Sequence, residues 1–272
     1  MVTFGLVTDI HFGPNTRFEG KLRKLCAQAP DLLAGFVREM ADSVRPDFIV
    51  NLGDVIEDES RDVDERRYRA ALARLQEAPC DVVHVAGNHD TIHLDGATLR
   101  RAWGVPAAGP LHYAFDRGPA RFIVLRTIEH RDTNITIDDE QLRWLAAELD
   151  AAADRPTVLF MHHSAADQNL AANRWFSRTE HIALLEDRAA FRALLRDRGN
   201  VVAVFNGHLH WNHLFMADQI PYVTVQSLVE NVDDDAPGRA AAAYAVVQLS
   251  ERKVEVEVRG LEPARYAVEL RR

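Results

Sequence analysis

The sequence is poor in cysteine and has no long hydrophobic run, and each shortage excludes a class of protein. Only Cys26 and Cys80 occur in 272 residues, which is too few for a disulfide framework, and their spacing matches no zinc motif. We expect both to be small buried hydrophobic residues. No apolar run approaches the roughly 18 residues of a membrane-spanning helix, and no basic segment typical of a signal peptide follows Met1. A cytoplasmic location is the expectation.

Positive charge is also scarce. The chain has 32 lysine and arginine residues against 41 aspartate and glutamate residues, and its formal net charge is −9. General nucleic-acid binding and binding to anionic membranes both require a basic face, so we expect neither. A small anionic ligand remains compatible with this balance, provided that bound cations reverse the sign of the charge locally.

The remaining composition is that of an ordinary globular protein, with 47% hydrophobic and 27% charged residues. We find no repeat, low-complexity segment or linker, so residues 1–272 are predicted to form a single domain. Its C-terminal part, from about residue 222, is rich in predicted strands.

Short apolar runs alternate with helical periodicities along most of the chain. Runs typical of strands are Val2–Thr8, Asp47–Leu52, Val82–Ala86, Phe122–Thr127, Thr157–Met161, Val201–Phe205, Tyr222–Gln226, Tyr244–Leu249, Val254–Val258 and Tyr266–Leu270. Patterns that predict helices cover Asp31–Ser43, Arg61–Glu77, Asp138–Leu149 and Asp187–Leu195. Alternation followed by a strand-rich end predicts an α/β fold of two packed sheets with helices outside them.

Residue types that bind metals recur directly after five of these strands. The clusters are Asp9–His11, Gly53–Asp54, Gly87–Asp90, His162–His163 and Gly207–His210. Ligands of open α/β sheets bind beyond the carboxyl ends of the strands, so we expect these loops to meet at one edge. Any one of these residues alone is more often structural. Their shared position after strands is what indicates a site.

The spacing within the clusters suits metal binding. Asp9 and His11 are two residues apart, and in an extended segment their side chains would point the same way. Gly53 permits a tight turn that would bring the Asp54 carboxylate forward to bridge two ions.

The donors of the five clusters are of mixed type. Asn88 adds an amide oxygen, and His162, His208 and His210 add imidazole nitrogens, a mixture that suits Mn, Fe or Zn better than Mg or Ca. Two such ions about 3.5–4 Å apart can share a bridging hydroxide and hold a phosphoryl oxygen. Two divalent ions, two carboxylates and a hydroxide sum to about +1, which matches a phosphodiester monoanion.

Together, and in this order, the five clusters resemble the signature of calcineurin-like metallophosphoesterases. They span residues 9–210. The resemblance implies a four-layer α/β/β/α sandwich of two mixed sheets flanked by helices, with two metal ions as cofactors. It assigns one ion to Asp9, His11, Asp54 and His210, and the other to Asp54, Asn88, His162 and His208.

The resemblance also implies roles next to the metals. It makes His89 the catalytic residue, acting on the leaving oxygen as a general acid or stabilising charge, and it makes Asp90 the residue that orients His89. Of the paired histidines, the family pattern selects His162 as the ligand and leaves His163 to line the pocket. Residues 164–166 are Ser-Ala-Ala, where related phosphodiesterases often carry prolines, so the loop around the substrate is expected to differ.

Several other residues are weaker candidates. His93 and His213 each lie three residues past a motif residue and could contact substrate, and Trp175 could wall its pocket, although packing is the commoner role for such residues. His84 lies inside an apolar strand and is expected to be a core residue whose ring is hydrogen-bonded. Glu230, in the loop after Tyr222–Gln226, could face the site, but a position away from it is the expectation.

The leading hypothesis is hydrolysis of a small phosphodiester. The segment Ala183–His210 resembles bacterial class III cyclic-nucleotide and glycerophosphodiester phosphodiesterases. Alternatives are a pyrophosphatase acting on ADP-ribose or CDP-alcohols, a phosphomonoesterase, and an inactive binding scaffold, although a scaffold would be expected to have lost ligands. A homo-oligomer formed through the part after Gly238 is left open.

Overall fold

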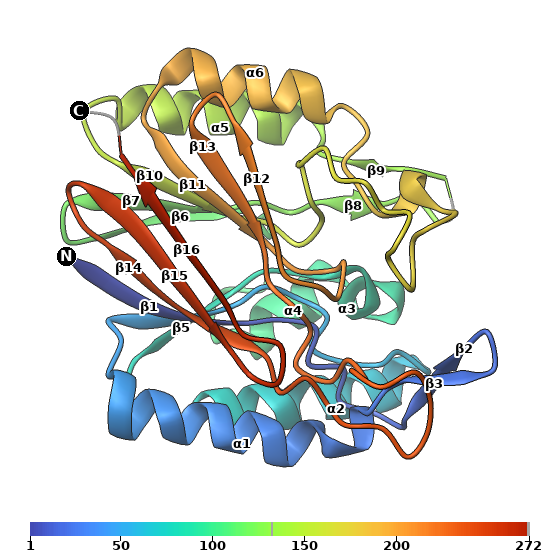
Figure 1. Cartoon of the computed structure of the whole chain (residues 1–272). Helices are drawn as coiled ribbons and strands as arrows, with labels where there is room; N and C mark the ends of the chain where they lie inside the picture. Colours follow the sequence, from blue (N-terminus) through green and yellow to red (C-terminus); the bar gives the residue numbers. More distant parts are fainter. Residues whose placement is uncertain (132, 271–272) are drawn as a thin grey trace.

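Two six-stranded sheets pack face to face in the computed structural model, which describes residues 1–131 and 133–270. Helices α1 (Ala29–Glu39) and α2 (Arg61–Leu75) cover the outer face of one sheet. Helices α5 (Asp139–Ala151) and α6 (Arg188–Arg198) cover the outer face of the other (Figure 1). The predicted fold class, a four-layer α/β/β/α sandwich, is confirmed.

The first sheet joins the start of the chain to its end, in the strand order β16-β15-β14-β1-β4-β5. Its strands are β1 (Val2–Val7), β4 (Phe48–Asn51), β5 (Asp81–His84), β14 (Tyr244–Leu249), β15 (Lys253–Arg259) and β16 (Ala264–Glu269). Strands β1, β4 and β5 are parallel, and the C-terminal strands add to β1 in antiparallel fashion.

The second sheet has the order β12-β13-β11-β10-β7-β6. Its strands are β6 (Tyr113–Arg117), β7 (Ala120–Val124), β10 (Thr157–Phe160), β11 (Val201–Asn206), β12 (His213–Ala217) and β13 (Ile220–Thr224). The four central strands are parallel, and the edge strands β6 and β12 are antiparallel to their neighbours.

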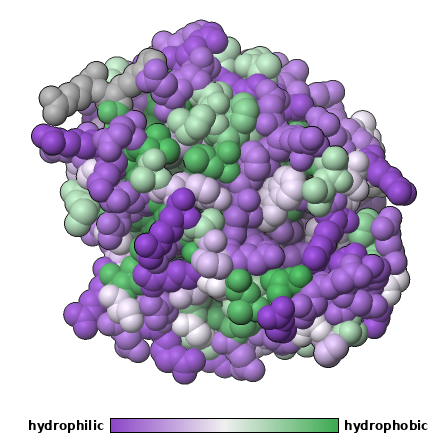
Figure 2. Space-filling model, viewed as in Figure 1, coloured by the Kyte–Doolittle hydropathy of each residue, from purple (hydrophilic) through white to green (hydrophobic). Residues whose placement is uncertain are grey.

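Smaller elements surround the ends of the central strands. They are the hairpin of β2 (Thr16–Phe18) and β3 (Lys21–Lys24), the pair β8 (Ile128–Glu129) and β9 (Ile135–Thr136), and the short helices α3 (Asn88–His93) and α4 (Gly96–Ala102). The β2–β3 hairpin projects beyond the sandwich (Figure 1). On the face shown in Figure 2, hydrophilic residues predominate and hydrophobic residues form separate patches.

Five phenylalanine side chains hold the two sheets together. Phe4 is fully buried, and its ring centroid lies 5.1–5.8 Å from those of Phe48, Phe122, Phe160 and Phe205. Stacked and edge-to-face pairs at these distances stabilise a core beyond the burial of their area. This contact sets the spacing of the sheets whose ends carry the site.

Every strand and helix predicted from the sequence has a counterpart in the structure, with ends displaced by a few residues. The edge strands β6 and β12 were not predicted, because their half-buried residues form no continuous apolar run. Cys26 is buried as expected, whereas Cys80 is only partly buried. The single-domain interpretation stays a prediction. No helix among the described residues is long and apolar enough to cross a membrane.

Candidate metal centre

The loops that follow β1, β4, β5, β10 and β11 meet at one edge of the sandwich. Backbone hydrogen bonds join them directly: Asp9 N–H donates to the Gly53 carbonyl and His11 N–H to the Asp54 carbonyl, both at 3.0 Å. Gly207 N–H likewise donates to the His162 carbonyl at 3.1 Å. All seven predicted metal ligands therefore lie close together, as the strand-end argument requires.

Most of the predicted ligands have an unusual backbone conformation. Among the described residues, ten non-glycine residues have positive φ, and five of them are Asp9, His11, Asp54, His208 and His210, with φ between 47° and 67°. A left-handed conformation costs a non-glycine residue about 1–3 kcal/mol, and such residues gather at functional sites. The extended backbone expected between Asp9 and His11 is therefore wrong, because both residues turn out of the strand to reach the site.

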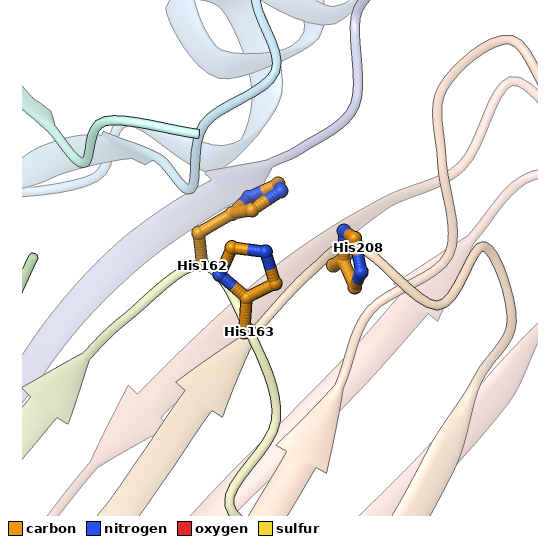
Figure 3. A group of neighbouring side chains, drawn as sticks. All are labelled: His162, His163 and His208. Carbon is orange, nitrogen blue, oxygen red and sulfur yellow. The ribbon is translucent and has the colours of Figure 1, made fainter. Parts of the chain in front are cut away.

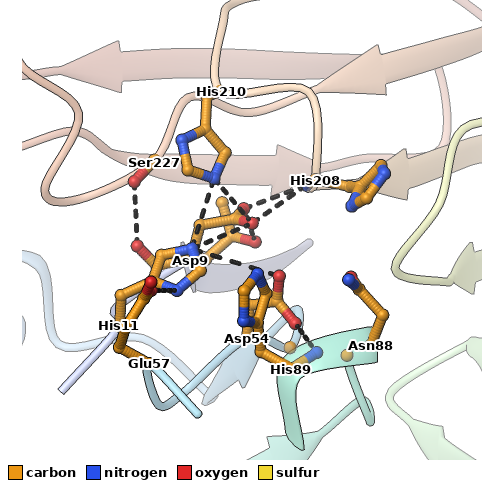
Figure 4. Close-up of polar contacts among 12 residues, drawn as sticks. Asp9, His11, Asp54, Glu57, Asn88, His89, His208, His210 and Ser227 are labelled. Carbon is orange, nitrogen blue, oxygen red and sulfur yellow. Dashed lines mark hydrogen bonds and ion pairs between the residues drawn. The ribbon is translucent and has the colours of Figure 1, made fainter. Parts of the chain in front are cut away.

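Position A is the space between Asp9, His11, His210 and Asp54. The Nε2 atoms of His11 and His210 are 3.3 Å apart, and Nε2 of His210 is also 3.3 Å from a carboxylate oxygen of Asp9 (Figure 4). The backbone N–H of His208 and the hydroxyl of Thr8 donate to the same carboxylate.

Position B is the space between Asp54, Asn88, His162 and His208. Nε2 of His162 lies 3.2 Å from Asp54 Oδ2 and 3.0 Å from Asn88 Oδ1. The Asp54 carboxylate also lies 4.0 Å from Nε2 of His11, so it stands between the two positions. His208 completes the group, with its ring centroid 5.1 Å from that of His162 (Figure 3).

His163 follows His162 in the chain, and its side chain lies beside position B. Its Nδ1 pairs with the Thr127 hydroxyl at 2.7 Å, and its ring lies against His208 with the centroids 4.2 Å apart (Figure 3). Its Nε2 has no hydrogen-bond partner among the described residues. His162, rather than His163, is the histidine that faces Asp54 and Asn88.

The donors present fit metal ions. Two imidazole nitrogens directed at one another, beside buried carboxylates, are arranged to share a cation. Three of the candidate clusters each bring donor atoms of buried residues within 4.8 Å of one another. Imidazole with carboxylate and amide oxygen suits Mn, Fe or Zn. The assignment of individual ligands to the two positions stays a prediction.

Buried carboxylates perturb the titration of the histidines around them. Burial disfavours the charged form of His162, but Asp54 outweighs it and raises the pKa of His162 to about 10. Burial likewise opposes the charge on His210, and Asp9 with Glu230 raises its pKa to about 9. Burial and the neighbouring His162 lower the pKa of His208 to about 3. The strong negative field at Asp9 and Asp54 is the field that a bound cation would neutralise.

Two motif glycines allow the loops to approach this closely. A Cβ atom on Gly87 would lie 2.2 Å from both the backbone nitrogen and a carboxylate oxygen of Asp54. Gly53 has φ of +103°, and a Cβ there would lie 2.7 Å from Nδ1 of His162. Neither position can accept a larger residue unless the metal-facing groups shift.

His89 stands at the mouth of the centre with a carboxylate partner. Its Nδ1 pairs with Asp58, and its backbone N–H donates to Asp54 at 2.9 Å. Burial alone would lower the pKa of His89, but Asp54 and the hydrogen bond to Asp58 raise it above its ordinary value. The prediction that Asp90 orients His89 is wrong. The Asp90 carboxylate accepts the backbone N–H groups of Val55 and Gly87 instead, which ties α3 to the loop after β4.

Two further carboxylates touch the centre and were missed from the sequence. Glu57 Oε2 lies 3.0 Å from Nδ1 of His11, and Glu230 Oε2 lies 2.8 Å from Nδ1 of His210. The expectation that Glu230 lies away from the site is therefore wrong. Glu57 could have been suspected because it follows Asp54 by three residues. No local pattern marks Glu230, which comes from a loop after β13.

The weaker candidates have different surroundings. Trp175 lies against His210 with ring centroids 5.4 Å apart, so it borders position A. His93 pairs with buried Asp64 at 2.7 Å, and His213 stacks on Trp211. Within the described residues, neither forms a hydrogen bond, ion pair or ring contact with a predicted ligand. Their contact with substrate stays a prediction.

Relatives of this chain are phosphodiesterases by name. It is 30% identical over 215 residues to a cAMP/cGMP dual specificity phosphodiesterase of Mycobacterium tuberculosis, covering 76% of this chain and 61% of that protein. It is 26% identical over 190 residues to a glycerophosphodiester phosphodiesterase of Enterobacter lignolyticus, covering 69% of this chain and 63% of that protein. The chain thus spans about three fifths of the length of these curated relatives.

Solved structures share the fold over its whole length. A dimetal phosphatase from Danio rerio superimposes with a TM-score of 0.78 at 19% identity, covering 99% of both chains. The family model described as calcineurin-like phosphoesterase matches residues 2–212, which include every predicted metal ligand. The chain therefore belongs to the calcineurin-like phosphoesterase family.

Proposed function

We propose that the protein is a binuclear metal-dependent phosphohydrolase that acts on small phosphodiesters of the cyclic-nucleotide or glycerophosphodiester type. The observation that carries this proposal is the Asp54 carboxylate, which lies 3.2 Å from Nε2 of His162 and 4.0 Å from Nε2 of His11. One carboxylate between two sets of donors is suited to a pair of ions. Two bound ions polarise a phosphoryl oxygen and lower the pKa of coordinated water.

The charges around the centre favour a monoanionic substrate. Two divalent ions with Asp9, Asp54 and a bound hydroxide sum to about +1 by formal count. Glu57, Glu230 and Asp58 add three negative charges, and Lys24 with a protonated His89 adds two positive charges, which leaves about zero. A phosphodiester monoanion adds one negative charge to this neutral centre, whereas a phosphomonoester dianion adds two, which a buried site accommodates less readily.

His89 is the residue proposed to act on the leaving group. Its Nδ1 is taken by Asp58, so Nε2 is the atom that can donate a proton. The raised pKa of His89, in which Asp54 and Asp58 overcome the effect of burial, favours the protonated form that a general acid needs.

The organic part of the substrate is proposed to occupy a cavity of about 730 Å³ next to position B. Phe176 lines this cavity, and its ring lies 4.7 Å from that of His208. Asn169, Arg178 and His181 make much of the remaining wall polar. Such a lining suits a sugar or base more than an alkyl chain.

Turnover of a small set of phosphate compounds tests the proposal. Protein stripped with a chelator and reloaded with Mn, Fe or Zn is given a cyclic nucleotide, a glycerophosphodiester, ADP-ribose and a phosphomonoester. We expect turnover of at least one diester, loss of activity on chelation, and a loss of about 10²–10⁴-fold in kcat for His89→Ala. Hydrolysis of the phosphomonoester alone would contradict the diester preference.

The same experiment separates an enzyme from a binding scaffold. A protein that retains no metal by elemental analysis and has no activity for His89→Ala to remove would be a scaffold. The native metal is the one among Mn, Fe and Zn that copurifies and supports the highest kcat/KM. A cytoplasmic location and a small phosphate ester as the substrate remain parts of this proposal.

A further inference from the structure

The four histidines of the proposed centre differ in what supports the ring nitrogen that faces away from the metals. At position A, Nδ1 of His210 is hydrogen-bonded to the Glu230 carboxylate at 2.8 Å, and Nδ1 of His11 lies 3.0 Å from the Glu57 carboxylate, within ion-pair distance but outside hydrogen-bond geometry. Both histidines of position A thus face an acidic partner (Figure 4 shows the first pair).

Position B has neutral partners instead. Nδ1 of His162 donates to the Leu52 carbonyl and Nε2 of His208 to the Ile182 carbonyl, each at 2.9 Å. A backbone carbonyl fixes the orientation of the ring, but it is a weaker hydrogen-bond acceptor than a carboxylate. It therefore raises the basicity of the ligating nitrogen less. The two positions share Asp54, so the difference lies in these partners and in Asp9, which faces position A.

The supporting carboxylates are themselves held in place. Glu57 accepts a hydrogen bond from the Thr16 hydroxyl at 2.8 Å and pairs with Lys24, both from the β2–β3 hairpin. Glu230 accepts from the indole N–H of Trp175 at 3.0 Å. Its side chain is 4% exposed and that of Glu57 is 14% exposed, so water competes little for either carboxylate.

The β2–β3 hairpin, which holds Glu57, also contacts Trp175, which holds Glu230. Nζ of Lys24 lies 5.3 Å from the centroid of the Trp175 ring, and Phe18 packs on the same ring at 5.0 Å. The hairpin that projects from the sandwich therefore forms, with Trp175, one wall behind both histidines of position A. No metal ligand is contributed by that wall.

We propose that Glu57 and Glu230 are positioning residues that make position A bind its ion more tightly than position B, and that the β2–β3 hairpin and Trp175 hold them in that role. This inference rests on the proposed metal centre. A carboxylate that accepts the second N–H of a metal-bound histidine fixes its tautomer and raises the basicity of the ligating nitrogen, and its loss lowers metal affinity about 10–100-fold.

Measurement of Mn²⁺ binding to chelator-treated protein tests the inference without any substrate. Isothermal titration calorimetry gives the affinities, and electron paramagnetic resonance quantifies the free ion. We expect two binding steps in the parent protein. His11→Ala should remove the tighter step and His162→Ala the weaker one, which assigns each step to a position.

The isosteric variants Glu57→Gln and Glu230→Gln should each weaken the tighter step about 10–100-fold and leave the weaker step unchanged. Glu59→Gln is the matched control, because Glu59 is exposed and pairs with Arg67 rather than with a histidine; both of its steps should equal those of the parent. Far-UV circular dichroism and unfolding midpoints verify that each variant is folded.

Equal weakening of both steps, or no weakening of the tighter one, in folded Glu57→Gln and Glu230→Gln proteins would overturn the inference while leaving the metal centre intact. A parent protein that binds fewer than two ions at saturation would instead refute the metal centre proposed above, and this inference with it.

Discussion

His84 should make the protein sensitive to mild acid, independently of the metal centre. It is the last residue of β5, its side chain is 4% exposed, and its ring stacks on Trp103 with centroids 5.8 Å apart. Its Nδ1 has no hydrogen-bond partner in the described part of the chain. Burial without an acidic partner lowers the pKa of His84 to about 4. The expectation that His84 is a core residue is confirmed, but the expectation that its ring is fully hydrogen-bonded is wrong.

His84 binds a proton more readily in the unfolded chain than in the folded one. The unfolded chain takes up a proton at His84 near pH 6.5, whereas the folded chain resists it down to about pH 4. The neutral imidazole therefore contributes its full stability above about pH 6.5, and this contribution is lost as the pH falls toward 4. The full contribution of the neutral imidazole to the free energy of unfolding is about 3 kcal/mol, of which about 2 kcal/mol is lost between pH 7 and pH 5.

Replacement of His84 by leucine should remove this dependence. Leucine fills a similar volume, so we expect a small change in the free energy of unfolding at pH 7. Between pH 7 and pH 5, the free energy of unfolding of the variant should fall by about 2 kcal/mol less than that of the parent. Urea denaturation monitored by tryptophan fluorescence, with chelator present throughout, measures this value.

Replacement of exposed His181 by leucine should leave the parent's pH dependence unchanged. If His84→Leu and the parent lose the same free energy of unfolding between pH 7 and pH 5, the buried, unpartnered state of His84 has been misjudged and the reasoning fails.

Three further perturbations probe other parts of the structure. Asp58→Asn should lower kcat for a diester about 10–100-fold with unchanged metal content, because the protonated state and orientation of His89 depend on Asp58; in a His89→Ala background it should have no further effect. Phe4→Ala should lower the free energy of unfolding by about 3–5 kcal/mol in urea, since Phe4 contacts four other phenylalanine rings between the sheets; a loss below 1 kcal/mol would mean that the sheets repack. Ala171→Trp, at the wall of the cavity beside position B, should raise KM for a nucleotide diester at least tenfold while kcat for methyl p-nitrophenyl phosphate stays unchanged. Ala190→Trp, on the exposed face of α6, is its control, and equal KM values in the two variants would place the organic group elsewhere.

The sequence was sufficient for the parts of the protein that depend on local patterns. Buried parallel strands such as Phe48–Asn51 read as short apolar runs, because both faces of the strand are covered. Helix α5 was predictable from its periodicity and from its start at Asp138, whose carboxylate accepts the N–H of Gln141. The predicted ligands were found because all of them follow strands, and strand ends converge in this class of fold.

Residues that act on the ligands were less accessible to such reasoning. Asp90 follows His89 directly and was predicted to be its partner. The helical turn of α3 instead directs the Asp90 carboxylate to backbone N–H groups, and His89 pairs with Asp58. Adjacent residues on a helix do not face each other, so proximity in sequence was the wrong guide.

By itself the sequence determined the succession of strands and helices and the residue types at the strand ends, because periodicity and turn chemistry are properties of neighbouring residues. Only the tertiary structure decided which carboxylates support which histidines. Glu230 reaches His210 because β13 lies beside β11 in the sheet, and Glu57 is held by a hairpin about 40 residues away in the chain. A contact at 3 Å between such residues depends on sheet order and on the course of whole loops, and no local pattern records either.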